Sequence, residues 1–280
     1  MSMQTIHVRD LQIGPGLPLV FIAGPCVIET RALVMSEAEH IRRIADELKV
    51  PIIFKASYLK DNRSSIKSPR GPGIEEGLRV LADVRDQYNM PITTDVHDTE
   101  QAHSAGDVVD LLQIPAFLCR QTSLLLAAAA TGKPINVKKG QFVSPTEMKS
   151  VIHKLVTANA SGIMLTERGT FFGYQRLVND FIGLADMADL GWPVCFDATH
   201  STQQPGSLGD LSGGRPERAP VLARAAVAAG VQALFFESHP DCQNALCDAA
   251  TMLPLDQLKP VLKQLTELHD FLLDQKELAH

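Results

Sequence analysis

The sequence has no long apolar run and no excess of basic residues, and each absence excludes a class of protein. Its 280 residues contain no stretch of about 18 apolar residues, the length that a membrane-spanning helix requires. Residues 1–18 lack the basic start and the apolar core of a signal peptide. The formal net charge is −6, so no basic face is expected for nucleic acid or an anionic membrane. We therefore expect a soluble, cytoplasmic protein that binds neither.

Cysteine is scarce as well. The chain has five cysteines, an odd number, and they are scattered: Cys26, Cys119, Cys195, Cys242 and Cys247. Secreted disulfide frameworks have paired cysteines at closer spacing. We therefore expect reduced thiols in a reducing compartment.

Short β-branched runs alternate with helical patterns along the chain, and no proline- or serine-rich linker interrupts them. Short, continuously apolar runs are typical of strands buried on both faces, and we expect strands at 19–25, 51–57, 91–96, 109–116, 134–139, 162–168, 193–199 and 233–239. Helices are expected at 31–48, 74–88, 99–104, 121–131, 145–159, 176–190, 217–229 and 255–274. This alternation predicts an α/β fold, a single (β/α)8 TIM barrel that forms one domain over residues 1–280.

Two segments lie outside the alternation. Within residues 1–18, Ile6 to Ile13 is followed by Gly14-Pro15-Gly16 and then by Leu17 to Val20. This arrangement indicates an N-terminal β-hairpin extension or an entry into the first strand. The segment from Gln203 to Gly214 is polar and rich in glycine, which predicts a mobile loop over one end of the barrel.

Charged and metal-binding residue types follow the apolar runs, always at the same end. In chain order they are Cys26, Lys55, Asp95 with His97, Gln113, Lys138 with Lys139, Arg168, Asp197 with His200, and Glu237 with His239. All strands of a parallel barrel end at one mouth, so these groups should converge on one pocket. With the further cations Lys60, Arg63, Lys67 and Arg70, the pocket should be basic although the protein is acidic.

Three of these cations need compensation. Lys55, Lys138 and Arg168 would repel one another unless an anion filled the space between them or carboxylates paired with them. We favour a bound phosphate or carboxylate group. The alternative is an internal salt-bridge network with Glu167 and Asp95.

Four residues offer the donor types of a transition-metal site. Cys26 has a thiol, His200 an imidazole, and Glu237 and Asp248 carboxylates. Each also has a common structural interpretation: a small buried apolar residue for the cysteine, a strand-end histidine, and loop caps or ion-pair partners for the two acids. The residues alone leave both interpretations open, with the structural one more frequent.

The segment after the second expected strand has the composition of a sugar-phosphate site. Lys55-Ala-Ser57 is followed by Lys60-Asp-Asn-Arg-Ser-Ser65, which combines point charges, a planar guanidinium and neutral hydrogen-bonding groups. A solvated basic loop is the alternative, yet Lys55 ends an apolar run and needs a buried partner. A desolvated Lys55 or Lys138 could also form a Schiff base, so an aldolase of that type is a second possibility.

A series of short motifs occurs in order at the expected strand ends: Gly24-Pro-Cys26, Phe54-Lys-Ala-Ser57, Asn62-Arg-Ser-Ser65, Arg70-Gly-Pro-Gly73, Thr94-Asp-Val-His97, Gln113-Ile-Pro-Ala116, Asn136-Val-Lys-Lys139, Phe196-Asp-Ala-Thr-His-Ser201 and Glu237-Ser-His-Pro240. From about residue 19 onward the chain resembles the 3-deoxy-D-manno-octulosonate 8-phosphate synthase family, also called 2-dehydro-3-deoxyphosphooctonate aldolase. The resemblance implies a homotetramer that condenses phosphoenolpyruvate with arabinose 5-phosphate and water. The products would be phosphate and the eight-carbon acid sugar used in lipopolysaccharide.

The resemblance also implies roles for matching positions. Phosphoenolpyruvate would be held by Lys55, Lys60, Gln113, Ala116, Lys138 and Arg168. The pentose phosphate would be held by Asn62, Arg63 and Ser64, with Ser57, Asp95 and His97 as further substrate-binding positions and Arg120 reaching a neighbouring subunit's site. The catalytic positions would be Cys26, Lys138, Arg168 and His200.

The family has metal-dependent and metal-independent branches, which differ by Cys or Asn at the position of Cys26. With Cys26, His200, Glu237 and Asp248 all present, the chain resembles the metal-dependent branch, which implies a divalent Zn, Fe, Mn or Co ion. Asp61 departs from the small apolar residue of many relatives. The related heptulosonate 7-phosphate synthases, which use erythrose 4-phosphate, carry a Lys-Pro-Arg-Thr type sequence where this chain has Asp61-Asn-Arg-Ser64. This difference favours the pentose phosphate.

Overall fold

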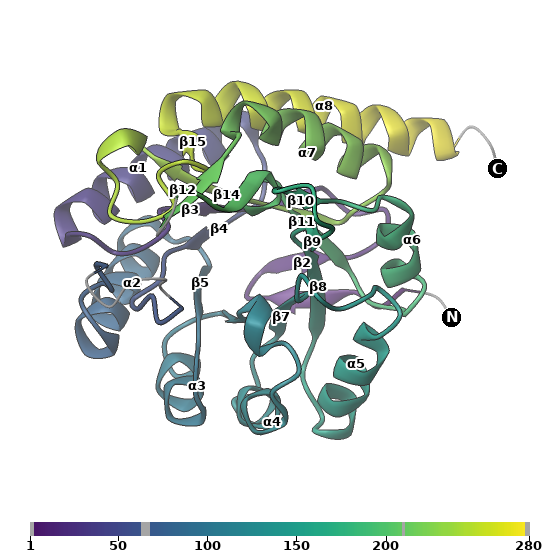
Figure 1. The fold of residues 1–280 in the computed structure, drawn as a ribbon, viewed down its shortest axis with the longest axis horizontal. Helices are drawn as coiled ribbons and strands as arrows, with labels where there is room; N and C mark the ends of the chain where they lie inside the picture. Colours follow the sequence, from purple (N-terminus) through teal and green to yellow (C-terminus); the bar gives the residue numbers. More distant parts are fainter. Residues whose placement is uncertain (1–2, 63–67, 209–210, 278–280) are drawn as a thin grey trace.

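A computed structural model describes residues 3–62, 68–208 and 211–277. Parallel strands form its centre (Figure 1): β3 (Val20–Gly24), β4 (Ile52–Lys55), β5 (Ile92–Asp95), β6 (Leu111–Ile114), β7 (Ile135–Lys138), β8 (Ile163–Glu167), β11 (Val194–Asp197) and β14 (Ala233–His239). Because β14 pairs with β3 on one side and with β11 on the other, the sheet closes into a barrel. The predicted (β/α)8 TIM barrel is confirmed, with every expected strand in place.

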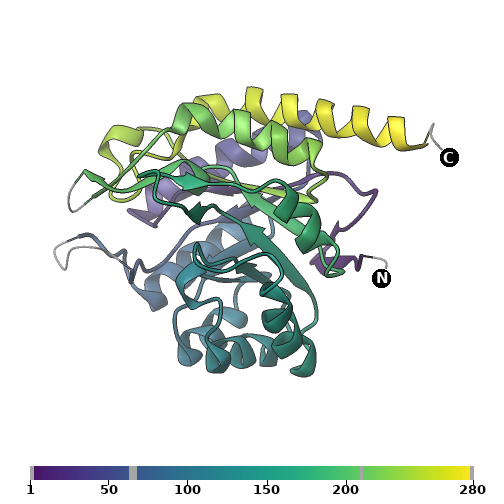
Figure 2. The same cartoon turned by 45° about the vertical axis from the view of Figure 1, so that its right-hand side comes forward.

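Helices surround this barrel (Figures 1 and 2): α1 (Arg31–Leu48), α2 (Ile74–Tyr88), α3 (Thr99–Gly106), α4 (Thr122–Ala130), α5 (Met148–Thr157), α6 (Ile182–Ala188), α7 (Ala219–Ala228) and α8 (Leu255–Glu277). They cover the outer face of the sheet, so every residue of β4 to β8 is buried, which explains the continuous apolar runs. Local signals set some boundaries: the Thr30 side chain caps α1, and Lys49 in the left-handed conformation ends it. No helix in the described ranges has the length and apolarity needed to cross a membrane.

The N-terminal hairpin exists, but its turn lies elsewhere than expected. Strands β1 (Ile6–Val8) and β2 (Leu11–Ile13) pair antiparallel across Arg9 and Asp10, and Arg9 has φ 53°. Gly14-Pro15-Gly16 instead connects the hairpin to the barrel. The apolar side chains of the hairpin pack against inward residues near the starts of the barrel strands, among them Met164 and Phe235. The hairpin therefore covers the amino-terminal end of the barrel.

Two further predictions are corrected. The helix expected at 176–190 is shorter, because β10 (Leu177–Val178) pairs with β9 (Thr170–Phe171) and α6 begins only at Ile182. The β-branched and aromatic residues around Gly173, which has φ 75°, favour that hairpin. The segment expected to be an unpaired loop forms β12 (Gln203–Leu208) and β13 (Leu211–Gly214), also antiparallel. Whether this second hairpin moves stays a prediction.

Side chains along β14 point alternately outward and inward, and the inward ones separate the apolar core from the charged residues of the mouth. Leu234 and Phe236 point outward into the layer between barrel and helices, whereas Phe235 points inward. Lys138 Nζ lies 3.7 Å from the centroid of the Phe235 ring. The ring therefore divides the apolar lower barrel from the charged residues above it, and Glu237, the next inward residue, lies on the charged side.

Candidate active site

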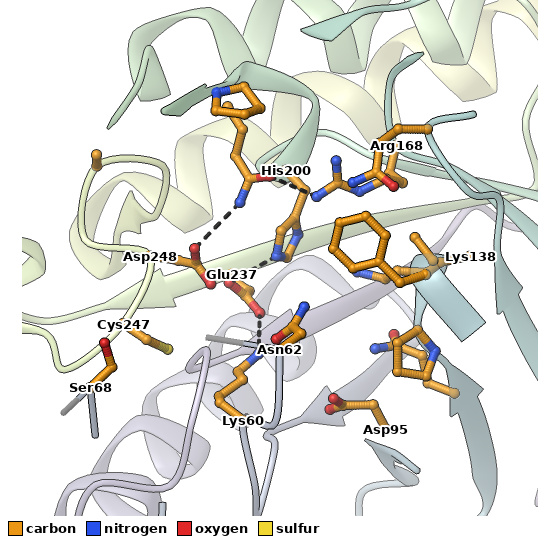
Figure 3. A pocket seen from close by; sticks show the side chains of 18 of the residues that line it. Lys60, Asn62, Ser68, Asp95, Lys138, Arg168, His200, Glu237, Cys247 and Asp248 are labelled. Carbon is orange, nitrogen blue, oxygen red and sulfur yellow. Dashed lines mark hydrogen bonds and ion pairs between the residues drawn. The ribbon is translucent and has the colours of Figure 1, made fainter. Parts of the chain in front are cut away.

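A cavity of about 490 Å³ lies at the carboxyl ends of the barrel strands (Figure 3). Most predicted site residues line it: Lys55, Lys60, Asn62, Asp95, His97, Gln113, Ala116, Lys138, Arg168, His200, Glu237 and Asp248. Ser57 is buried beside this lining and donates a hydrogen bond to Asp95. Arg120 is exposed and lies outside the lining of this chain's own cavity. Arg63 and Ser64 lie outside the described residues.

Lys55 ends β4 with only 1% of its surface exposed. Its Nζ lies 2.8 Å from Glu237 Oε1 and donates a hydrogen bond to the Cys26 carbonyl at 3.0 Å. Burial lowers the pKa of Lys55 despite this carboxylate. Burial alone would raise the pKa of Glu237, but Lys55 and His200 hold it well below its ordinary value. The sequence predicted that Lys55, at the end of an apolar run, needs a buried partner, and that partner is Glu237.

Lys138, at the end of β7, has a different partner. Its Nζ lies 2.5 Å from Asp197 Oδ2, and His200 Nδ1 lies 2.7 Å from the same oxygen. Although burial opposes ionisation, these two groups hold the pKa of Asp197 far below its ordinary value. Asp197 therefore fixes the orientation of both a predicted catalytic lysine and a predicted metal ligand. The sequence placed Asp197 at a strand end but assigned it no role.

Arg168 follows β8 and is 6% exposed. Its Nη2 donates a hydrogen bond to Gln203 Oε1 at 2.7 Å, whereas Nη1 has no hydrogen-bond partner within the described part of the chain. Burial lowers the pKa of this guanidinium. The suggested partner Glu167 instead lies 3.4 Å from Lys139 Nζ. A buried guanidinium with an unused donor is suited to bind an anionic ligand.

Asp95 organises a third polar group at the end of β5. It accepts a hydrogen bond from Ser57, and its Oδ2 lies 3.2 Å from His97 Nε2. Burial would raise the pKa of Asp95, but Lys60 and His97 hold it well below its usual range. Burial also opposes the charge on His97, yet Asp95 raises the pKa of its imidazole. The pair therefore lines part of the cavity with hydrogen-bonding groups.

Within the described residues, which exclude Arg63 and Lys67, the cavity is less basic than expected. Four cations of this part of the chain line it, Lys55, Lys60, Lys138 and Arg168, together with three carboxylates, Asp95, Glu237 and Asp248. Lys139 is outside the lining and close to Glu167, and Arg70 pairs with Asp61 at the surface. The correction has a physical reason, because a buried lysine is stable as a cation only beside a carboxylate. Some of these charges are separated: in Figure 3, Asp248 lies on one side and Arg168 and Lys138 on the other. Lys55 and Lys60, in contrast, lie beside Glu237.

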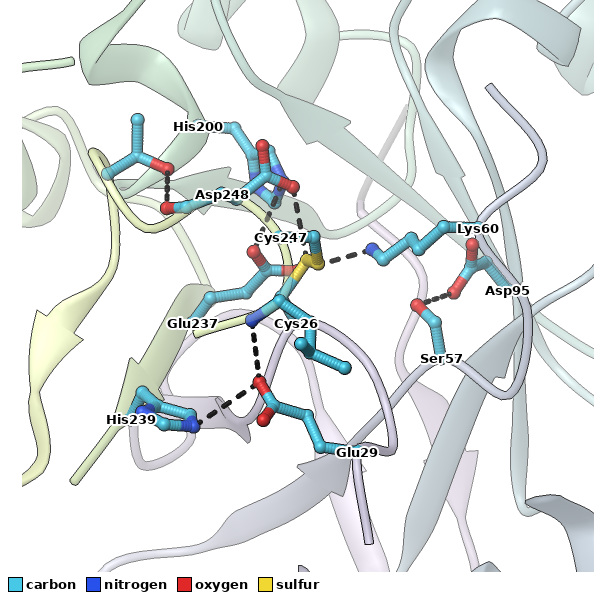
Figure 4. Close-up of a disulfide and its surroundings, with 12 residues drawn as sticks. Cys26, Glu29, Ser57, Lys60, Asp95, His200, Glu237, His239, Cys247 and Asp248 are labelled. Atoms are coloured by element: carbon cyan, nitrogen blue, oxygen red, sulfur yellow. Dashed lines mark hydrogen bonds and ion pairs between the residues drawn. A yellow bond between two sulfur atoms is a disulfide. The ribbon is translucent and has the colours of Figure 1, made fainter. Parts of the chain in front are cut away.

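The four predicted metal ligands lie together in two overlapping groups (Figure 4). The first contains Cys26, Cys247 and Asp248, and the second His200, Glu237 and Asp248, with ligand atoms within 4.8 Å of one another in each. Glu237 Oε2 lies 3.4 Å from His200 Nε2 and makes no hydrogen bond to any described residue. The two groups together offer a sulfur, an imidazole nitrogen and carboxylate oxygens, and Glu237 Oε2 is free to bind a ligand. This set of donor atoms fits a divalent transition metal of borderline softness.

One expectation about the cysteines is wrong. Cys26 and Cys247 form a disulfide, with Cα atoms 6.5 Å apart, whereas Cys119, Cys195 and Cys242 are free. The two residues are 221 positions apart, and barrel closure places the end of β3 beside the segment after β14. Cys26 Sγ also lies 3.0 Å from Asp248 Oδ2. The Cys26 thiolate is therefore available to a metal only after reduction.

Sequence reasoning missed two residues of this site. Gln203 lines the cavity and bonds to both Arg168 and Asp248, and Cys247 is bonded to Cys26. A glutamine that starts a polar segment carries no chemical signature. Cys247 had one signal, because it directly precedes the predicted ligand Asp248.

Comparison with known proteins agrees with this geometry. The sequence profile described as DAHP synthetase I family matches residues 2–274. The chain is similar to the 2-dehydro-3-deoxyphosphooctonate aldolase of Protochlamydia amoebophila (strain UWE25), with 50% identity over 95% of this chain and 98% of that protein. Proteins of the same name from Koribacter versatilis (strain Ellin345) and Cyanothece sp. (strain PCC 7425 / ATCC 29141) are each 53% identical. These matches cover 96% and 91% of this chain and 97% and 94% of those proteins. The chain belongs to the DAHP synthetase I family, among its 2-dehydro-3-deoxyphosphooctonate aldolases.

Proposed function

We propose that the chain condenses phosphoenolpyruvate with D-arabinose 5-phosphate and water to give 3-deoxy-D-manno-octulosonate 8-phosphate and phosphate, a step of lipopolysaccharide biosynthesis. Relatives that share half of its residues over nearly their whole length carry the name of this aldolase. The observation in the structure that carries the proposal is Arg168, buried at the cavity wall with Nη1 unbonded to any described residue. Lys138 on the same side supplies a second cation for an anionic substrate.

The substrates occupy different parts of the mouth in this proposal. Phosphoenolpyruvate binds through lining residues of the cavity: Lys55, Lys60, Gln113, Ala116, Lys138 and Arg168. The pentose phosphate binds toward the segment after β4, through Ser57, Asn62, Arg63, Ser64, Asp95 and His97, and Arg120 serves the site of a neighbouring subunit. Carbon 3 of phosphoenolpyruvate attacks the aldehyde, water attacks carbon 2, and phosphate leaves by carbon–oxygen cleavage. Lys138 and Arg168 stabilise the negative charge of the phosphate and carboxylate groups throughout.

Cys26, His200, Glu237 and Asp248 hold a divalent Zn, Fe, Mn or Co ion in this proposal. Such an ion supplies Lewis-acid polarisation and orientation of the aldehyde when bound. Asp197 keeps the His200 ring oriented through Nδ1, which leaves Nε2 facing Glu237. The chain's own contribution is thus to hold the ligand side chains in place, with Lys55 and Lys60 beside Glu237.

Assembly as a homotetramer in the cytoplasm completes the proposal. Exposed aromatic side chains near the mouth support association with further copies: Phe117, Phe142, Phe171, Phe172 and Tyr174. Phe172 and Tyr174 stack with ring centroids 6.1 Å apart, and exposed apolar groups that gather in a patch often mark contacts with another protein. Sedimentation equilibrium should give four times the chain mass, and a stable monomer at micromolar concentration would contradict the tetramer. Fractionation of cells should recover the protein with cytoplasmic markers.

The reaction is tested by phosphate release. Reduced enzyme with Mn²⁺ should release phosphate from phosphoenolpyruvate with arabinose 5-phosphate, and at least tenfold more slowly with erythrose 4-phosphate. Excess chelator should abolish the activity, and added Mn²⁺ or Co²⁺ should restore it. Equal rates with both sugars would favour a heptulosonate 7-phosphate synthase, and full activity in chelator would refute the metal.

Substitution of Asn62 tests the sugar side. Asn62 lines the cavity next to the segment assigned to the pentose phosphate. Asn62→Ala should raise KM for arabinose 5-phosphate about tenfold, as expected for one lost hydrogen bond to a charged group, and change KM for phosphoenolpyruvate less than twofold. Steady-state kinetics with each substrate varied in turn would measure both. An equal effect on the two KM values would contradict the assignment.

The Schiff-base alternative is tested by trapping. Burial lowers the pKa of Lys55, as that chemistry needs. However, Glu237 and the Cys26 carbonyl occupy Lys55 Nζ, and Asp197 lies 2.5 Å from Lys138 Nζ. Borohydride with either substrate should therefore leave both lysines unmodified in peptide mass spectra. A reduced adduct on either lysine would establish the alternative.

A further inference from the structure

Gln203 lies in the cavity between Arg168, a proposed substrate-binding cation, and Asp248, a proposed metal ligand. Its side-chain Oε1 accepts a hydrogen bond from Arg168 Nη2 at 2.7 Å, and its Nε2 donates one to Asp248 Oδ1 at 3.3 Å. We propose that Gln203 is a positioning residue that keeps Arg168 and Asp248 apart, so that one remains free for the anionic substrate and the other for the metal. The inference rests on the roles proposed above for these two residues.

The chemistry of the amide explains why this residue type fits the position. Arg168 offers only donors, and the Asp248 carboxylate only acceptors, so a single residue between them must accept on one side and donate on the other. A neutral carboxamide does both. A carboxylate would pair with Arg168 and repel Asp248, and a cationic side chain would do the reverse.

Arg168 and Asp248 carry opposite charges and should form a direct ion pair if the amide between them is removed. Arg168 is buried, and Asp248 is one of the carboxylates that raise its pKa against the larger effect of burial. An unscreened ion pair in this position would occupy the guanidinium that phosphoenolpyruvate needs. It would also withdraw Asp248 from His200 and Glu237, with which it forms the second ligand group.

The backbone of Gln203 is held on two sides. Its N–H donates to the carbonyl of His200, the first residue of the 3₁₀ turn η2 (His200–Thr202). It also pairs with Gly214 at the base of the β12–β13 hairpin. Gln203 therefore contacts His200, Arg168 and Asp248. Because its backbone is held in this way, its side-chain amide has fewer accessible positions than it would have in an unpaired loop.

Binding to the metal-free, reduced protein tests this role without turnover. Calorimetric titration with phosphoenolpyruvate should give about a tenfold higher Kd for Gln203→Met, which keeps the length but removes both hydrogen bonds. The double variant Gln203→Met with Asp248→Asn should bind within twofold of wild type, because the carboxylate that captures Arg168 is gone. Gln203→Glu should weaken phosphoenolpyruvate binding at least as much as Gln203→Met does. Adding Asp248→Asn to Gln203→Glu should not restore the affinity, because the new carboxylate still pairs with Arg168. Mn²⁺ binding, followed by its electron spin resonance signal, should weaken in Gln203→Met as well.

The outcomes separate two claims. Wild-type affinity in Gln203→Met, or weak binding that persists in the double variant, would overturn the positioning role alone. A folded wild-type protein that binds neither phosphoenolpyruvate nor Mn²⁺ would overturn the proposed function and this inference with it. Circular dichroism melting of each variant provides the folding control, since a general structural defect would not be reversed by a second substitution at Asp248.

Discussion

Glu237 is fully buried within β14, two residues before its end, and its carboxylate remains ionised there because Lys55, Lys60 and His200 surround it. The same arrangement recurs around Asp197, with Lys138 and His200. Each of these two buried carboxylates is thus stabilised by specific cationic neighbours, and removal of one member leaves the others uncompensated. Single substitutions in this network should therefore affect both folding stability and binding.

Glu37 is a buried acid on α1 that the proposed chemistry does not use. Its Oε1 accepts a hydrogen bond from Ser238, and burial raises its pKa to about 8 from 4.5. Because the folded state holds this proton more tightly, the associated stability is complete below pH 4.5 and is lost as the pH rises through 8. Glu37→Gln should therefore become progressively more stable relative to wild type between pH 5 and about pH 9.

Urea unfolding of both proteins across this pH range measures the effect. Glu39→Gln is the matched control, since Glu39 is an exposed glutamate on the same helix and should follow the wild-type profile. Parallel pH profiles for Glu37→Gln and wild type would show that Glu37 titrates near its ordinary pKa.

At the scale of elements, the barrel strands were predictable because burial on both faces leaves a continuous apolar run for each. The hairpins were harder, since β9 and β10 have only two residues each and β12 and β13 are polar and glycine-rich. Strands this short or this polar give a weak local signal, and contacts of β10 with β12 and with the 3₁₀ turn at His200–Thr202 also support the hairpins. The β1–β2 hairpin was expected, but its turn residues Arg9 and Asp10 were not.

The β1–β2 hairpin should stabilise the fold without contributing to the chemistry. Ile13 is fully buried in the lower barrel, whereas Gln12 beside it is exposed. Ile13→Ala should lower the free energy of unfolding by about 2–5 kcal/mol, and Gln12→Ala by less than about 0.5 kcal/mol. Urea denaturation measures both, and kcat at 25 °C should stay at the wild-type value. A large loss of kcat in folded Ile13→Ala would show that the hairpin influences the mouth.

At the scale of the whole molecule, closure of the barrel brings Cys26 beside Cys247. Oxidised protein should therefore bind no stoichiometric metal, because the sulfur of Cys26 is in a disulfide. Dithiothreitol should release two thiols per chain and restore binding of one divalent ion. Metal analysis after dialysis, together with thiol titration, measures both quantities.

Cys247→Ser separates oxidation from metal binding. This variant should bind metal with or without dithiothreitol, because Cys26 has lost its bonding partner. Cys26→Ser should bind metal weakly in both conditions. Equal metal content in oxidised and reduced wild-type protein would contradict a ligand role for Cys26.

The sequence by itself determined the barrel, the order of its strands and most residues of the mouth, because strand burial and strand-end chemistry are local patterns that repeat along the chain. Only the tertiary structure decided which charges meet: Lys55 with Glu237, Lys138 with Asp197, Arg168 with Gln203 and Cys26 with Cys247. These pairs join strands and loops distant in sequence, and their distances depend on how the sheet closes. A local pattern predicts that the sheet closes, but it does not determine which side chains meet once it has closed.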